Sequence, residues 1–302
     1  MNKSNIKNKK PTTKNKTATK NPTKDIIENI ITVKGHGPIL ITGSHTVTTI
    51  RRSEEIHTNE QYISKIINEL YKLLGPKKCT IMTWNNDFIE KNRIYPEDPN
   101  HILNIDDSIW YSKLKEIKDK LNKESNKSNK SNTNNKIFHI DLHGMTDDWF
   151  KHDKHICIGT HSIKSFYPKR YKLIKAILIK NFNTLNVPIT LNNPFNGHST
   201  KKYPCKFYTL SHKGVLLGFF SIQLEISFSL RKNIAYNKSC LKKFKNVIEE
   251  CYKNLNSLQK TEPPHKIQKH KIQKHKIQKH KIQKHKTQKY KTQKHKTQKH
   301  KT

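Results

Sequence analysis

The sequence predicts an α/β protein with three αβα layers around a mixed, mainly parallel β-sheet. First, short apolar runs of strand length alternate along the chain with amphipathic stretches of helical period. Second, one of these runs, IFHIDLHG at 137–144, stops abruptly at a glycine, as a buried strand does at its end. Third, His45, His143 and Gly159 follow apolar runs, at the carboxyl ends of strands where sites gather in such sheets.

The apolar runs predict the strands of a sheet that is covered on both faces. Each run has the length of a strand and is followed by turn residues or by a change to helical spacing. The expected strands are Pro38–Ser44, Cys79–Trp84, Ile137–Gly144, His155–Gly159, segments near Val187 and Phe207, and Gly218–Ser227.

Amphipathic stretches between these runs predict the helices. Asn59–Leu74 places apolar residues at helical spacing and is followed by Gly75, a common C-terminal cap. Asp107–Leu121 has the same spacing behind an acidic start. We expect a third helix around Tyr171–Leu185, and a helix with Ser239 as its N-cap, 239–258, to close the domain.

The 302 residues are enough for one large domain, which we place at residues 25–262. Within it, the polar stretch 122–135 is expected to loop out. Residues 1–24 are rich in Lys, Asn and Thr and are expected to be disordered. The tail 263–302 repeats HKIQK and then HKTQK, and this period of five matches neither a helix nor a heptad. We expect the tail to be a solvated, disordered segment.

The formal net charge of +37 is concentrated at the two ends. Residues 1–24 hold eight Lys and residues 265–302 hold fifteen, with no acidic residue in either, which leaves +14 on residues 25–264. Such a tail could bind nucleic acid or other polyanions non-specifically, with a steep dependence on salt. A solubilising role is the alternative, because lysine repeats also arise from AT-rich coding sequence. Seven tail histidines could in addition chelate metal non-specifically.

Cysteine usage and hydropathy predict a soluble intracellular protein, cytoplasmic in location. The five cysteines are scattered and form no C-x-x-C pair, which favours reduced thiols over disulfides. No apolar run approaches the ~18 residues of a membrane helix. The N-terminus has no hydrophobic core of the kind that a secretory signal carries.

Three fragments carry residues suited to metal and acid–base chemistry. In DLHG, Asp141 and His143 are two residues apart and therefore leave the same face of a strand. His45 follows the first strand, and Glu55 precedes the first long helix. With His143 they make a two-His, one-carboxylate set, the ligand set of many catalytic zinc hydrolases. Glu54 is the alternative carboxylate. The simpler alternatives are an exposed histidine at a strand end and an acidic residue near a helix N-terminus.

Glu225 lies on the last expected strand, in QLEIS at 223–227. A carboxylate on an interior strand needs a charge, a hydrogen-bond donor or a metal-bound water beside it. A salt bridge with Arg231 or a lysine would satisfy it structurally. The functional interpretation makes Glu225 a general base.

The order of these fragments resembles the N-formylglutamate amidohydrolase-like family, which is similar in fold to zinc carboxypeptidases and aspartoacylases, a phosphorylase/hydrolase-like fold. Each fragment is short, and the resemblance rests on their shared order across nearly the whole region expected to be ordered. The matching pieces are SHTVTTIRRSEEIHT (44–58), DPN (98–100), DLHG (141–144), IGT (158–160), NPFNGHST (193–200) and QLEIS (223–227).

The resemblance implies a zinc-dependent amidohydrolase that cleaves a C–N amide bond of a small N-acyl amino acid or peptide-like substrate with a metal-activated water. It implies Zn²⁺ held by three residues, with Glu225 as the catalytic carboxylate and Asp141 orienting a ligand histidine. Arg51 would bind a substrate carboxylate, and Asn100, Gly197 and His198 would lie at the substrate. The implied zinc ligands are His45, Glu55 and His143.

Two departures from the family pattern affect the loops around the site. The usual PHxG context of the first ligand is GSHT here, without the proline and the glycine. The glycine pair expected after PF is replaced by Asn196-Gly197-His198, which brings a further histidine near the site as ligand, acid or bystander. A catalytically inactive hydrolase-like protein that binds nucleic acid or other polyanions through its basic ends is therefore the alternative function.

Overall fold

The structure is a computed structural model that describes residues 29–51, 54–127, 136–150, 153–197 and 207–258. The expected disordered segments 1–24 and 263–302, and His198, lie outside the described residues. No helix within the described ranges is long and apolar enough to cross a membrane.

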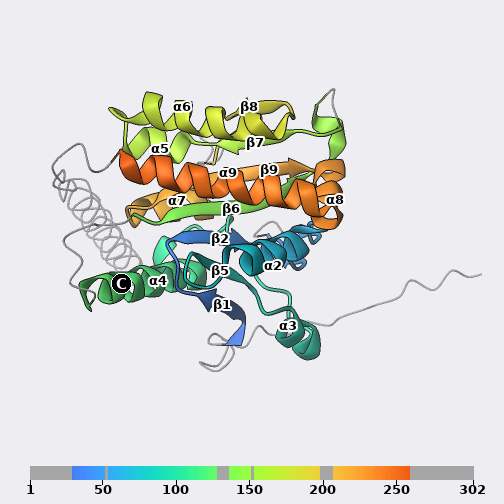
Figure 1. The fold of residues 1–302 in the computed structure, drawn as a ribbon. Coiled ribbons are helices and arrows are strands. Elements are labelled where there is room, and N and C mark those ends of the chain that lie inside the picture. The colour runs from blue at the N-terminus through green and yellow to red at the C-terminus, as the bar shows by residue number, and fades with distance from the viewer. Residues whose placement is uncertain (1–28, 52–53, 128–135, 151–152, 198–206, 259–302) are drawn as a thin grey trace, which may run out of the picture. The chain divides into compact units, whose positions relative to one another are not determined.

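A seven-stranded mixed sheet forms the centre of the fold, and helices flank it (Figure 1). The four central strands β5, β2, β6 and β9 are parallel, β1 pairs antiparallel with β5, and β7 pairs antiparallel with β9 and parallel with β8. The predicted three-layer α/β class is confirmed. In sheet order the strands are β1 (Ile31–Gly35), β5 (Cys79–Trp84), β2 (Ile39–Gly43), β6 (Phe138–Met145), β9 (Phe220–Ser227), β7 (Ile156–Gly159) and β8 (Ile189–Leu191).

A two-stranded ribbon and the helices complete the described elements. The ribbon pairs β3 with β4 antiparallel and lies between His45 and the first long helix. The bounds are β3 (Thr49–Ile50), β4 (Ile56–His57), α2 (Ile63–Leu74), α3 (Asn86–Asn92), α4 (Ile109–Lys127), α5 (His161–Phe166), α6 (Tyr171–Phe182), α7 (Leu210–Leu216), α8 (Phe228–Tyr236), α9 (Lys238–Ser257), and the 3₁₀ turns η1 (Ile105–Asp107), η2 (Asp147–Trp149) and η3 (Asn183–Leu185).

Close packing at two glycines shows that α2 and α7 cover opposite faces of the sheet. A side chain at Gly43 of β2 would meet Ile67 of α2 at 2.5 Å. A side chain at Gly214 of α7 would meet His139 of β6 at 2.5 Å. Because side chains alternate along a strand, the odd-numbered residues of β6 face α7. Figure 1 shows α2 and α9 together in front of the sheet.

Three local expectations differ from the structure. Helix α4 continues to Lys127, six residues into the stretch 122–135, because Lys and Glu residues such as Lys123 and Glu124 are good helix formers. The strand expected near Phe207 is wrong: residues 207–209 are irregular and α7 follows them, with Thr209 accepting a hydrogen bond from the His212 backbone. Asn237, rather than Ser239, caps α9, since its side chain accepts the N–H groups of residues 239 and 240.

Candidate metal centre

Four side chains with metal-binding atoms meet at the carboxyl ends of β2 and β6. His45 follows β2, His57 ends β4, Glu60 lies in the turn before α2, and His143 belongs to β6. His45 Nδ1 is 2.8 Å from Glu60 Oε1 and 3.1 Å from His57 Nε2. His57 Nε2 is 3.4 Å from the same Glu60 oxygen. These three residues form a cluster that could hold a metal ion.

His45, His57 and Glu60 form one triangle of possible ligand atoms, and His143 forms a second triangle with His45 and Glu60. His143 Nδ1 lies 3.1 Å from His45 Nδ1 and 3.7 Å from Glu60 Oε1. A tetrahedral zinc site with bonds of about 2.0–2.1 Å separates its ligand atoms by roughly 3.3 Å, so both triangles have suitable dimensions. Glu60 is fixed from the other side, because its Oε2 accepts the backbone N–H of Gly144 at 2.7 Å.

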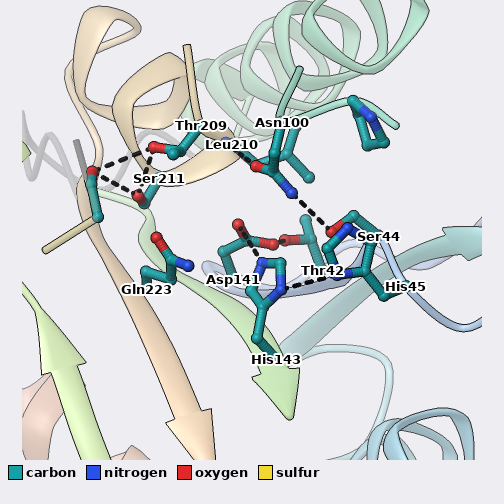
Figure 2. Close-up of polar contacts among 12 residues, drawn as sticks. Thr42, Ser44, His45, Asn100, Asp141, His143, Thr209, Leu210, Ser211 and Gln223 are labelled. Atoms are coloured by element: carbon teal, nitrogen blue, oxygen red, sulfur yellow. Dashed lines mark hydrogen bonds and ion pairs between the residues drawn. The ribbon is translucent and has the colours of Figure 1, made fainter. Parts of the chain in front are cut away.

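A buried aspartate holds the far nitrogen of each central histidine. His45 Nε2 is 3.1 Å from Asp98 Oδ1. His143 Nε2 is 2.9 Å from Asp141 Oδ2 (Figure 2). Each ring therefore donates its Nε2–H to a carboxylate and turns the Nδ1 lone pair towards the cluster. Two neutral rings cannot place these lone pairs 3.1 Å apart unless a proton or a metal ion lies between them. The donor set therefore fits a divalent cation that takes nitrogen and oxygen ligands.

The charges around these histidines favour a cation. Burial alone would lower the pKa of His45, but Glu60 and Asp98 outweigh it and raise that pKa to about 9. Burial also opposes the charge on His143, yet Asp141 and Glu225 raise its pKa well above the usual range. Burial acts to raise the pKa of Glu60, whereas His45 and hydrogen bonds from the histidines bring it well below the usual range. Metal binding at such a centre would release protons.

Glu225 lies beside His143, because the two are register partners on the adjacent strands β9 and β6. Its side chain is buried, and its Oε1 accepts a hydrogen bond from Gln223 Nε2 at 2.7 Å. Burial raises the pKa of Glu225 to about 7, with Glu60 adding to the rise and His143 opposing it. A carboxyl group with this pKa can both accept and release a proton near neutrality. The salt bridge considered with Arg231 is not formed; Arg231 donates to the backbone carbonyls of residues 61, 145 and 226.

The structure does not bring Glu55 to the cluster. Its side chain is 62% exposed and pairs with Arg51 at 3.4 Å between Nη1 and Oε1. Glu54, the alternative, is exposed and has a left-handed backbone with φ of 60°. The carboxylate next to His45 is Glu60, because the β3–β4 ribbon lengthens the connection and α2 begins only at Ile63.

Arg51 and Asn100 lie close to the centre through Asp98. Arg51 Nε donates to Asp98 Oδ2 at 3.2 Å, so this carboxylate bridges Arg51 and His45. The Asn100 backbone N–H donates to Asp98 Oδ1 at 2.9 Å. The Asn100 amide joins two segments: Nδ2 donates to Ser44 Oγ at 3.0 Å, and Oδ1 accepts the Leu210 N–H at 2.8 Å (Figure 2). Asn100 therefore holds the loops around His45 in place.

Gly197 has a left-handed backbone with φ of 66° and lies against Gly159 of β7. Its carbonyl accepts hydrogen bonds from the hydroxyl groups of Ser162, Thr209 and Ser211. A side chain at 197 would approach the Gly159 carbonyl oxygen at 2.8 Å, so this contact requires glycine. Gly197 thus anchors the loop that leads to His198, which lies outside the described part of the chain.

Sequence reasoning missed Glu60, His57 and Asp98. One signal for the first two was present: HTNE at 57–60 has H-x-x-E spacing, the pair that was missing between His45 and Glu55. Asp98 belongs to the DPN fragment, in which only Asn100 was assigned a role. Its importance follows from tertiary contacts, since Asp98 lies 53 residues from His45 along the chain.

No protein-family model matches the chain, and no curated protein sequence does. Among solved structures, the chain is similar to the crystal structure of N-formylglutamate amidohydrolase from Ralstonia eutropha JMP134. The TM-score is 0.41, with 10% sequence identity, over 76% of this chain and 98% of that chain. At this TM-score the likeness carries no inference about activity or about the site residues.

Proposed function

We propose that the protein is a zinc-dependent amidohydrolase that cleaves the C–N amide bond of a small N-acyl amino acid or peptide-like substrate. The observation that supports it most is the convergence of His45 Nδ1, His143 Nδ1 and Glu60 Oε1 beside a buried carboxyl group, Glu225. When bound at such a centre, zinc lowers the pKa of a water molecule and polarises a carbonyl group. The sequence resemblance to N-formylglutamate amidohydrolases points to the same chemistry.

His45, Glu60 and His143 are the proposed zinc ligands, with Glu60 in the role that was expected for Glu55. His143 is preferred to His57 because its ring is buried and Asp141 fixes its Nε2–H, whereas the His57 side chain is 24% exposed. His57 Nε2 is a further donor at the edge of the cluster. A catalytic zinc site keeps one position open for water or substrate, so His57 would have to leave that position free.

Glu225 is the proposed general base and acid. Its carboxylate would take a proton from the attacking water and deliver it to the nitrogen of the leaving amine. A pKa of about 7 suits both transfers, and the Gln223 amide holds Oε1 in position. Arg51 is the proposed partner of a substrate carboxylate, since its guanidinium lies next to Asp98 at the centre and is 23% exposed.

The Glu225→Gln variant tests this mechanism. The amide keeps the size of the side chain but cannot accept the proton, so the zinc content should equal that of wild type while turnover of N-acyl amino acids falls at least about 100-fold. Glu55→Gln is the matched control, because its carboxylate is exposed and away from the cluster. Turnover at the wild-type rate in Glu225→Gln would refute the proposed role.

The alternative function, polyanion binding by the basic ends, concerns residues outside the described part of the chain and stays a prediction. A version without residues 263–302 should bind nucleic acid more weakly, and the loss should shrink as salt increases.

A further inference from the structure

Two rows of polar residues lie in register on the face of the sheet that α7 covers. On β6 the row is His139, Asp141 and His143, at alternate positions. Their register partners on β9 are Ser221, Gln223 and Glu225. The outer pair, His143 and Glu225, belongs to the proposed centre. The inner pair, His139 and Ser221, is fully buried and takes no direct part in the proposed reaction.

A chain of hydrogen bonds connects the inner pair to the centre through Thr42 of β2. Thr42 Oγ1 donates its single proton to Asp141 Oδ1 at 2.8 Å (Figure 2). The 3.0 Å contact between Thr42 Oγ1 and His139 Nε2 must therefore be an Nε2–H donation from the ring. A neutral His139 then accepts from Ser221 Oγ at Nδ1, at 2.6 Å. Burial lowers the pKa of His139 to about 4, which keeps the ring neutral.

Every donor in this chain points towards Asp141. Ser221 donates to His139, His139 to Thr42, and Thr42 to Oδ1, while His143 Nε2–H donates to Oδ2 from the other side. Both oxygens of Asp141 thus have a donor, and its carboxylate cannot turn without breaking a buried bond. Aligned donors strengthen one another, and an unpaired buried polar group is costly.

The packing of α7 depends on this inner pair. A side chain at Gly214 would lie 2.5 Å from His139 Nδ1 and 2.7 Å from Ser221 Oγ. A glycine inside a helix is less favourable than an alanine. Here the glycine lets α7 close over the two polar groups and exclude water from them, so that each must find its partner within the chain.

From this geometry we infer that Thr42 and His139 are positioning residues of the centre: they hold Asp141, which in turn holds His143 with its Nδ1 facing the metal position. The inference rests on the proposed function and extends it by naming residues that act through Asp141. Neither residue touches the substrate or the metal. Their effect is to keep His143 in one tautomer and one orientation, so that the ligand nitrogen is in place before the metal arrives.

The test compares Thr42→Val, which keeps the shape and removes the hydroxyl group, with Thr42→Ser, which keeps the donor. In the full chain, Thr42→Val should weaken zinc binding about 10- to 100-fold in competition with a chromophoric chelator, and Thr42→Ser should stay within a few-fold of wild type. Thr80→Val is the matched control. Thr80 is buried on the neighbouring strand β5 and donates to the Gly37 carbonyl at the same 2.8 Å, but has no bond to the centre.

A second readout uses the metal-free protein. A histidine N–H held by a buried carboxylate exchanges slowly and gives a downfield proton NMR signal. Wild type and Thr80→Val should show this signal for His143 Nε2–H, and Thr42→Val should lose it. Wild type that binds no zinc would refute the proposed metal centre, but the NMR comparison would still test the positioning role.

Equal zinc affinity and an unchanged His143 signal in Thr42→Val would overturn the inference. If Thr42→Val does not fold, His139→Leu and His139→Gln form a second pair, because glutamine can place an N–H donor near the position of the ring Nε2. His139→Gln should then bind zinc more tightly than His139→Leu, and equal binding by the two would contradict the inference.

Discussion

Each side chain of the proposed ligand set is held in place by a residue that does not touch the metal position. Asp98 holds His45, Asp141 holds His143, and the Gly144 N–H holds Glu60. The contact between Asp141 and His143 could be predicted, because the two-residue spacing in DLHG puts both side chains on one face of a strand. Asp98 could not, since only the folded chain brings it to His45. Glu60 had one signal in the sequence, its H-x-x-E spacing from His57, but its contact with His45 appears only in the folded chain.

In the proposed mechanism, Glu225 sets the pH dependence of kcat/KM. The base must be deprotonated, so activity should rise as pH increases through the pKa of Glu225, which burial raises to about 7. A bound cation nearby lowers the pKa of Glu225 and therefore moves this rising limb of the pH profile to lower pH. Gln223→Leu removes a donor that favours the carboxylate and should therefore move the limb to higher pH than in wild type. A limb at the same pH in both proteins would contradict this assignment.

At the scale of elements, most strands and long helices could be predicted from the periodicity of apolar residues, because apolar residues mark the positions of a strand or helix that become buried. The β3–β4 ribbon did not, since two-residue strands are too short to show a pattern. That ribbon explains why Glu60, and not the expected Glu55, lies at the cluster. It separates His45 from Glu60 by 15 residues and leaves Glu55 on the surface. The edge strand β1 also escaped prediction; its central residues are exposed and its sequence lacks a long apolar run.

The ribbon places His57 at the cluster, and the His57→Ala variant tests the role of this histidine. The variant should bind zinc somewhat more weakly, because one donor near the metal is lost, but should keep turnover, because His57 is not among the proposed ligands. His143→Ala is the comparison and should lose both. Cobalt substitution gives a second reading, since visible absorption reports how many protein ligands bind the ion. A complete loss of zinc from His57→Ala would make His57 an essential ligand.

Strands β6 and β9 are joined at their carboxyl ends by Arg231, and Gly144 makes room for it. A side chain at 144 would lie 2.0 Å from Arg231 Nη1, so Gly144→Ala must displace a guanidinium that holds the carbonyls of Met145 and Ile226. We expect a loss of about 1–3 kcal/mol in the free energy of unfolding, measured by urea denaturation. Met145→Leu, a volume-conserving change at the next position, should cost less. Similar losses in both variants would contradict this account.

At the scale of the whole molecule, the α/β class could be predicted because alternating strands and helices leave few ways to bury a parallel sheet. The edge of the sheet that carries the proposed centre follows from the same logic, since parallel strands present their carboxyl ends together. The order of the edge strands could not be predicted, because pairing across β9 and β7 depends on contacts far apart in sequence. The two basic ends add most of the charge without a pattern that fixes a structure.

The most direct test of the central claim is metal stoichiometry in the full chain after dialysis against a weak chelator. Elemental analysis should find one more tightly held zinc per chain in wild type than in Glu60→Gln, while Glu55→Gln should equal wild type. The difference between variants cancels metal held by the histidines of the tail, which all three proteins share. An equal zinc content in wild type and Glu60→Gln would contradict the proposed centre. Loss of zinc in Glu55→Gln alone would show that Glu55, and not Glu60, is the carboxylate ligand.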